Sequence, residues 1–152
     1  MMKISKTLAR LAAAGALLLT LTACAPTVNL EAAPDANNPA CAEVSVRLPD
    51  EIDGNTKRVT NAQATAAWGN PSAVILRCGL PTVEVSTLSC VSAGGVDWLV
   101  DDSQSPSYRF ISFGRTPATE VIVDSSAIAG VTALDALASA VKNIDATKTC
   151  SE

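Results

Sequence analysis

The chain has 152 residues and carries 11 basic against 15 acidic side chains, a formal net charge of −4. Nucleic acids bind basic surfaces, so this balance argues against nucleic acid as a partner. Histidine is absent, which excludes Ser-His-Asp and Cys-His nucleophile systems and most zinc sites. The length predicts one domain, and the chain has neither a P-loop nor a dinucleotide-binding glycine motif, so no cofactor is expected.

Residues 1–23 predict a lipoprotein signal peptide. Residues 1–10 contain three basic side chains and no acid, and residues 11–22 form the apolar stretch LAAAGALLLTLT. This stretch is shorter than the roughly 20 residues that cross a bilayer as a helix. It ends in Leu-Thr-Ala-Cys24, which matches the bacterial lipobox. A buried core helix or a plain secretory signal is the alternative interpretation.

Cys24 is therefore expected to become the mature N-terminus and to carry a diacylglycerol group. Two acyl chains hold a protein stably on a bilayer. We expect the membrane as a partner through this anchor, with the protein on the outer face of the cytoplasmic membrane. Cleavage would remove three basic residues and no acid, leaving 8 basic against 15 acidic side chains, or −7.

Residues 24–40 are rich in Pro, Ala and Asn and offer little to bury. Such a composition predicts a flexible tether that lifts the domain off the membrane, with the domain itself at residues 41–150. An even number of cysteines in an exported chain predicts two disulfides. Of the three possible pairings of these four cysteines we favour Cys78–Cys90 with Cys41–Cys150.

Strand patterns dominate the expected domain. A near-continuous apolar run at residues 72–78 suits a central strand. Alternating patterns predict further strands, with a hairpin between the last two, at residues 44–48, 96–100, 108–113 and 118–124. Residues 49–55 read as a turn region and residues 101–106 as a loop, whereas residues 61–68 allow either a helix or an extended segment.

One amphipathic helix is expected near the C-terminus. Thr132 could cap its start, with Asp135 in the capping-box position. Apolar side chains then follow at helical spacing: Leu134, Leu137, Ala138, Val141 and Ile144. The predicted fold class is α+β, a small antiparallel or mixed sheet with this helix packed on one face and disulfides as staples.

Two motifs resemble reactive or metal sites. Ser139 and Lys142 match S-x-x-K, yet they fall on the polar side of the helix and the partner motifs are missing, so a solvated face is preferred. Asp97, Asp101 and Asp102 lack the glycine and distal glutamate of a calcium loop, so a solvated strand edge is preferred there and no metal is expected.

Three side chains are candidate ligand or partner contacts. Trp68, within Trp-Gly-Asn-Pro, is either an aromatic platform or part of the core, and scarce aromatic residues favour the core. Arg77 and Arg115 could bind a carboxylate or phosphate group. Arg77 lies in the expected central strand, where pairing with an acid of the chain is the favoured interpretation.

Four blocks of sequence resemble an actinobacterial family of exported proteins, the domain of unknown function 3515. They are Ala-Trp68-Gly-Asn-Pro, Val-Ile-Leu-Arg77-Cys78-Gly, Val-Asp97-Trp and Gly-Arg115-Thr-Pro, spread over residues 41–150. The resemblance implies a small envelope-associated domain and brings no catalytic residue.

The expected function is that of a non-enzymatic binding or accessory module of the cell envelope, with an envelope protein or a small ligand as partner. The alternatives are a hydrolase-like enzyme with a Ser/Lys or carboxylate site, and a structural spacer. A pocket holding Arg77 or Arg115 would favour ligand binding, a cleft at Ser139 and Lys142 an enzyme, and a flat apolar patch around Trp68 a protein partner.

Overall fold

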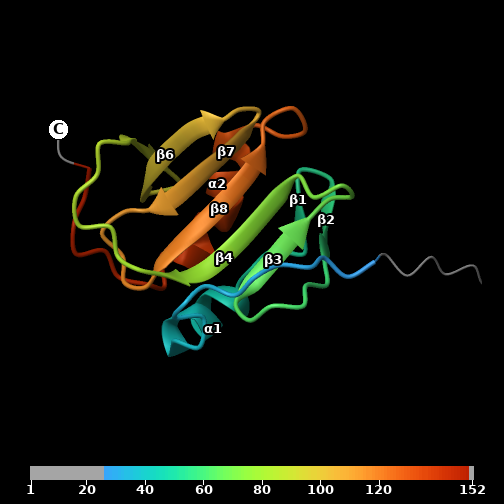
Figure 1. Ribbon diagram of the computed structural model, residues 1–152, viewed down its shortest axis with the longest axis horizontal. Helices are drawn as coiled ribbons and strands as arrows, with labels where there is room; N and C mark the ends of the chain where they lie inside the picture. Colours follow the sequence, from blue (N-terminus) through green and yellow to red (C-terminus); the bar gives the residue numbers. More distant parts are fainter. Residues whose placement is uncertain (1–25, 151–152) are drawn as a thin grey trace, which may run out of the picture.

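A computed structural model describes residues 26–150, so the predicted signal peptide and Cys24 lie outside the described residues. The described chain forms an eight-stranded antiparallel sheet in the order β1-β2-β3-β4-β8-β7-β6-β5 (Figure 1). The strands are β1 (Glu51–Ile52), β2 (Asn55–Arg58), β3 (Thr65–Trp68), β4 (Val74–Leu80), β5 (Ser89–Ala93), β6 (Val96–Gln104), β7 (Ser107–Ser112) and β8 (Ala118–Asp124). The helices are α1 (Pro39–Ser45) and α2 (Gly130–Val141).

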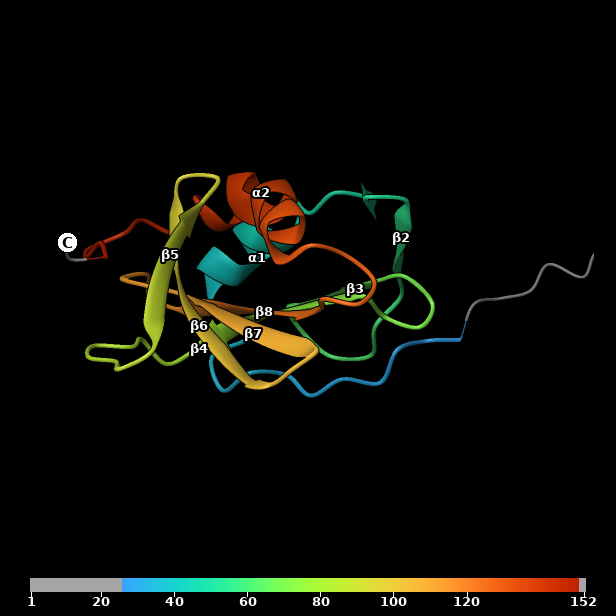
Figure 2. The same cartoon turned by 90° about the horizontal axis from the view of Figure 1, so that it is seen from above.

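Both helices cover one face of this sheet, and the chain from residue 26 to 38 runs across the other face (Figure 2). The α+β expectation is thus confirmed in its coarse form, with a sheet that is entirely antiparallel and larger than expected. Alternation along each strand separates a helix-covered face, which holds the main core, from an outer face.

The apolar run predicted as a central strand is β4, which lies between β3 and β8. Its even-numbered residues Val74 and Leu76 are fully buried under the helices, opposite Val123 and Val121 of β8. The expected hairpin is formed by β7 and β8. Cross-strand pairs of branched apolar side chains stabilise such a sheet, and here they also make the surface on which α2 packs.

Helix α2 confirms most of the predicted apolar stripe, because four of the five expected residues lie in it and are buried: Leu134, Leu137, Ala138 and Val141. The fifth, Ile144, is also buried but follows the end of the helix. The predicted start is wrong. The helix begins at Gly130, and its N-cap is Ala129, which makes no side-chain hydrogen bond to the helix. Tertiary burial of the stripe therefore positions this helix end without help from a capping side chain.

Several expected element boundaries differ from the structure. Residues 44–48, predicted as a strand, begin with the end of α1, in which Val44 and Cys41 are buried three residues apart. The short alternating pattern also satisfies one helical turn, and Pro39 at the first position favours a helix start. Residues 101–104, predicted as a loop, continue β6 beyond Val100. The ambiguous segment ends in strand β3.

The predicted flexible tether is also wrong for residues 26–40. Residues 26–38, here called the strap, lie along the outer face of the sheet (Figure 2), where the backbone N–H of Asp35 donates to the carbonyl oxygen of Gly79 at 2.9 Å. Ala33 and Ala36 are buried. The fold therefore includes residues 26–40, because two small apolar side chains and the strap backbone find partners on the sheet.

Gly79 allows the strap to approach β4 so closely. Its φ is +108°, and a Cβ atom at this position would lie 2.5 Å from the backbone nitrogen of Ala36. Any side chain here would displace the strap as well as strain the backbone. The glycine that follows Cys78 thus joins the N-terminal segment to the central strand.

All four cysteines of the domain form disulfides, as predicted, but the predicted pairing is wrong. The bonds are Cys41–Cys78 and Cys90–Cys150, which close loops with sequence separations of 37 and 60 residues. The first joins α1 to the buried face of β4, and the second joins the sheet-edge strand β5 to the C-terminal segment. Cys78 and Cys90 cannot pair because Cys78 points into the core beneath α1.

Candidate functional site

Trp68 is a core residue. Its side chain is fully buried and its indole Nε1 donates to the carbonyl oxygen of Pro49 at 3.0 Å. The proposed ligand or partner contact at Trp68 is therefore wrong, and the core interpretation is confirmed. The indole instead fixes the segment before β1 to the end of β3, in the way that buried tryptophans commonly satisfy their one donor.

Arg115 is also unsuited to binding a ligand. It is buried, and its guanidinium donates to the carbonyl oxygen of Ile144 just after α2. Burial lowers the pKa of Arg115, and the charges of Asp145 and Asp97 partly oppose this. Its role is to attach the end of the helix to the β7–β8 hairpin, so its assignment as a ligand contact is wrong.

Arg77 alone of the three candidates lies in an open depression. It is on the outer face of β4, directly opposite Glu120 of β8. Its Nε donates to Oε2 of Glu120 at 2.9 Å, and a second nitrogen lies 2.8 Å from the same oxygen. The sequence-based expectation that Arg77 pairs with an acid is confirmed.

A second arginine that sequence reasoning missed completes the group. Arg109 of β7 donates through Nε to the other carboxylate oxygen of Glu120. The Glu120 side chain is only 3% exposed, whereas those of Arg77 and Arg109 are 32% and 38% exposed. Alternation along a strand indicates which residues share a face, and this applies to Arg109 in β7 and to Glu120 in β8. Only the order of the strands in the sheet shows that these two residues are neighbours.

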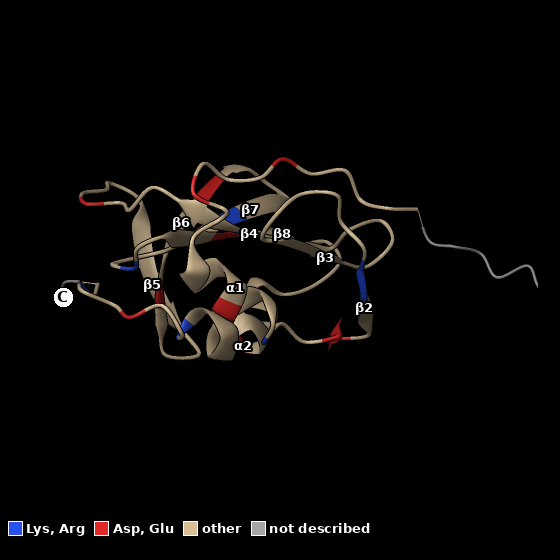
Figure 3. Cartoon of the chain, turned by 90° about the horizontal axis from the view of Figure 1, so that it is seen from below, with Lys and Arg blue, Asp and Glu red and all other residues tan. Residues whose placement is uncertain are grey.

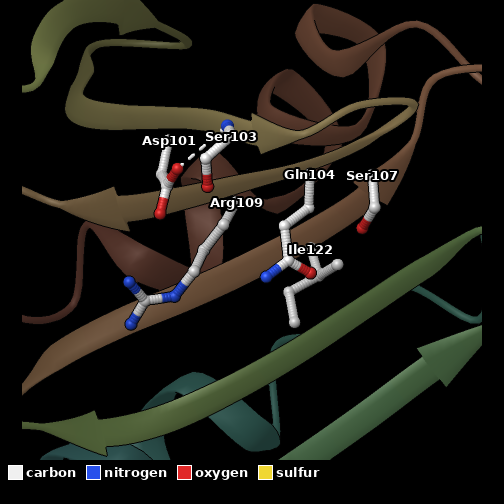
Figure 4. A pocket seen from close by; sticks show the side chains of 6 residues that line it. All are labelled: Asp101, Ser103, Gln104, Ser107, Arg109 and Ile122. Carbon is white, nitrogen blue, oxygen red and sulfur yellow. Dashed lines mark hydrogen bonds between the residues drawn. The ribbon is translucent and has the colours of Figure 1, made fainter.

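These three residues line a depression of about 260 Å³ whose other walls come from β3, β4, β8 and the strap: Leu30, Glu31, Thr65, Ile75 and Ile122. A smaller depression of about 100 Å³ adjoins it and shares Arg109 and Ile122. Figure 4 shows Asp101 and Ser103 on one side of Arg109, and Gln104 and Ser107 on the other. We call the two together the outer-face trough.

Glu120 leaves part of each guanidinium free. Its oxygens occupy Nε of both arginines and one terminal nitrogen of Arg77, while the terminal nitrogens of Arg109 have no hydrogen-bond partner among the described residues. A buried carboxylate that holds two guanidiniums in place is a rigid support for donors that face an open depression.

Acidic and basic positions alternate along the trough; Figure 3 shows how the two signs are interspersed over the fold. Glu31 and Asp101 flank the two arginines. Hydrogen bonds from Ser103 lower the pKa of Asp101, and the charge of Arg109 adds a smaller effect in the same direction. The lining thus carries two cations against three carboxylates, a balance that disfavours multiply charged anions.

The alternative reactive and metal sites gain no support. Ser139 and Lys142 are exposed on the solvent side of α2. Asp97 instead accepts hydrogen bonds from Ser92 and from the backbone of Cys150. Within residues 26–150, no group of three or more His, Cys, Asp or Glu residues is arranged to hold a metal ion.

A scan of protein families matches residues 6–149 to the family described as "Protein of unknown function (DUF3515)". The chain belongs to the DUF3515 family. The match extends beyond the residues that carried the resemblance and includes the strap, in agreement with the packing of the strap onto the sheet. This DUF3515 protein has no match among curated proteins, and no solved structure matches it.

The residues that carry the resemblance have structural roles in this DUF3515 domain. Trp68 fills the core, Arg77 pairs with Glu120, Cys78 forms a disulfide with Cys41, and Gly79 admits the strap. Helices long and apolar enough to cross a membrane are absent from the part of the chain that the structure describes.

Proposed function

We propose that this DUF3515 protein is a lipoprotein anchored through Cys24 to the outer face of the cytoplasmic membrane. We further propose that its domain is a non-enzymatic binding module. The order of basic, apolar and small-residue zones that ends in Leu-Thr-Ala-Cys24 supports the anchor. The domain supplies the binding surface, and the outer-face trough is where that surface lies.

The observation that carries the binding proposal is the pair of arginines on one buried carboxylate. Arg77 and Arg109 present free guanidinium donors in an open depression. Glu120 fixes the position of both arginines, and both stay partly exposed to solvent. Guanidinium groups bind carboxylates with two parallel hydrogen bonds. The three carboxylates along the trough repel phosphate, so the ligand is a singly charged carboxylate, as on a small molecule or at a peptide terminus.

The anchor is tested by Cys24→Ala. This variant should carry no acyl chains and should leave the detergent phase on temperature-induced phase partitioning, since the acyl chains supply the membrane affinity. Thr20→Ala, which leaves the four lipobox residues intact, is the control and should partition like the unaltered protein. Acyl chains found by mass spectrometry on the Cys24→Ala variant would disprove the assignment.

The trough is tested with acetyl-Ala-Ala-Ala, whose only charge is its terminal carboxylate. The arginine Nε–H signals of Arg77 and Arg109 should shift during an NMR titration, with a dissociation constant on the order of millimolar for so exposed a site. The matching peptide amide should shift neither signal. Equal shifts with acid and amide, or none at all, would remove the trough as a carboxylate site.

Variants make that test specific. Arg77→Gln and Arg109→Gln should each weaken binding by about fivefold or more, because each removes a charged donor. Arg47→Gln is the matched control, since Arg47 is likewise an exposed arginine paired with a carboxylate, that of Glu43 on α1. A loss of affinity in the control as large as in the trough variants would show that net charge, and not the trough, binds the peptide.

A further inference from the structure

The strap is attached at its start to one end of the domain. The carbonyl oxygen of Pro26, the first described residue, accepts a hydrogen bond from Arg58 of β2 at 2.6 Å. Two residues later, the backbone N–H of Val28 donates to the carbonyl oxygen of Val59 at 2.9 Å. Asn61 continues the attachment, since its side-chain oxygen accepts from the N–H of Leu30 at 2.8 Å. The chain therefore enters the fold beside residues 58–61.

The proposed lipid anchor lies very near this point of entry. Cys24 precedes Pro26 by two residues, and an extended chain spans at most about 3.6 Å per residue. The Cα atom of Cys24 therefore stays within about 7 Å of that of Pro26. A tether of this length leaves the domain little freedom to turn another side toward the bilayer.

We infer that the end of the domain formed by residues 54–61 and the β3–β4 turn rests on the phospholipid headgroups, so that the domain stands on the membrane in one orientation. This inference rests on the proposed acylation of Cys24. The surface there is a shallow hollow with Lys57, Arg58 and the exposed Val59 in its wall. The occupant of that surface is the headgroup layer of the membrane that holds the anchor.

Charge alone would not produce this orientation. Figure 3 shows basic residues on β2 but acidic ones on the neighbouring β1. The acids Asp50, Glu51 and Asp53 outnumber Lys57 and Arg58 in this hairpin. The short covalent link must therefore set the orientation, and the lipid charge should change it little.

The opposite end of the domain would point away from the bilayer. Figures 1 and 2 agree in placing the start of the strap beside β2 and β3, at the other end of the long axis from the loop between β4 and β5 and the C-terminal segment. Val85 in that loop is 89% exposed, and Val59 at the strap end is 71% exposed. These two valines are matched reporters for the two ends.

The test uses the full acylated chain in phosphatidylcholine vesicles that contain nitroxide-labelled headgroups. A fluorophore is attached to Val59→Cys or to Val85→Cys, both exposed positions outside the disulfides. Quenching should be at least threefold stronger at position 59 than at position 85. Insertion of 12 Gly and Ser residues after Ala25 should reduce this difference to nearly nothing, because the longer link frees the domain to turn.

Equal quenching at the two positions on an acylated protein would overturn the orientation and leave the anchor intact. Stronger quenching at position 59 that persists after the insertion would also overturn the orientation. The same holds if the stronger quenching at position 59 occurs only when phosphatidylglycerol replaces part of the phosphatidylcholine. Intact mass measured on the same sample separates the two proposals. Absence of acyl chains would overturn the anchor and the orientation together.

Discussion

Buried polar side chains in this domain differ in whether they have hydrogen-bond partners. Glu120 is buried on the outer face and receives donors from two arginines, whereas the Thr119 hydroxyl beside it in sequence faces the helix-covered core. That hydroxyl has no hydrogen-bond partner among the described residues. A buried polar group without a hydrogen-bond partner destabilises a fold. The buried charge of Glu120 is paired and fixes the positions of the two arginines in the trough.

Thr119→Val should therefore raise the free energy of unfolding by about 1 kcal/mol, since valine has nearly the same shape and no hydroxyl to desolvate. Urea denaturation followed by circular dichroism measures this change. Thr119→Ser, which keeps the hydroxyl and removes a methyl group, is the control and should lower stability by about 1 kcal/mol. A less stable valine variant would mean that the hydroxyl is satisfied in solution, for instance by ordered water.

At the scale of elements, packing and not a capping side chain determines where helix α2 begins. Helix α2 has its apolar stripe fully buried but lacks a capping side chain at Ala129, whose backbone already has extended geometry, with φ −67° and ψ 134°. The predicted cap at Thr132 is inside the helix. The missing cap costs less stability than the packing of the stripe on the sheet provides, because each buried leucine contributes more free energy than one capping interaction does.

Ala129→Ser should stabilise the domain by about 1 kcal/mol, because a serine oxygen at the N-cap accepts from a free backbone N–H in the first turn. The midpoint of thermal unfolding, measured together with urea denaturation, reports this gain. Ala127→Ser, also exposed but two residues before the cap, should change stability by less than about 0.5 kcal/mol. An equal gain in both variants would argue against capping as the cause.

At the scale of the whole molecule, two disulfides and the strap join segments that are far apart in sequence. Cys41–Cys78 ties α1 to the central strand, and Cys90–Cys150 ties the far edge of the sheet to the C-terminal segment. The strap passes over the outer face and forms part of the trough wall through Leu30 and Glu31. The candidate site is therefore complete only when the N-terminal segment is in place.

The pairing can be checked on the unreduced protein by cleavage at glutamate, which cuts after Glu84 between Cys78 and Cys90. Cys41 should be recovered joined to Cys78, and Cys90 joined to Cys150. Replacing either pair with alanine should cost about 4 kcal/mol of stability on the chain-entropy model, given the separations of 37 and 60 residues. A fragment that joins Cys78 to Cys90 would contradict this fold.

Much of the fold could be predicted from the sequence because it depends on local periodicity. The central strand at β4, the β7–β8 hairpin and the buried stripe of α2 follow from spacings of two or of three to four residues. An even number of cysteines indicated disulfides, and Arg77 was expected to meet an acid. The lipobox at Cys24 is also a local signal, and the anchor that it indicates stays a prediction.

The tertiary structure alone decided which distant residues meet. Disulfide pairing, the partnership of Arg77 and Arg109 on Glu120, and the burial of Trp68 and Arg115 depend on strand order and on which face each strand presents. The strap has too few apolar side chains for its packing to be predicted from its sequence. Its position on the sheet also depends on the missing side chain of Gly79, about 40 residues later. Local spacing sets each element's buried face, but only the assembled sheet determines what lies opposite that face.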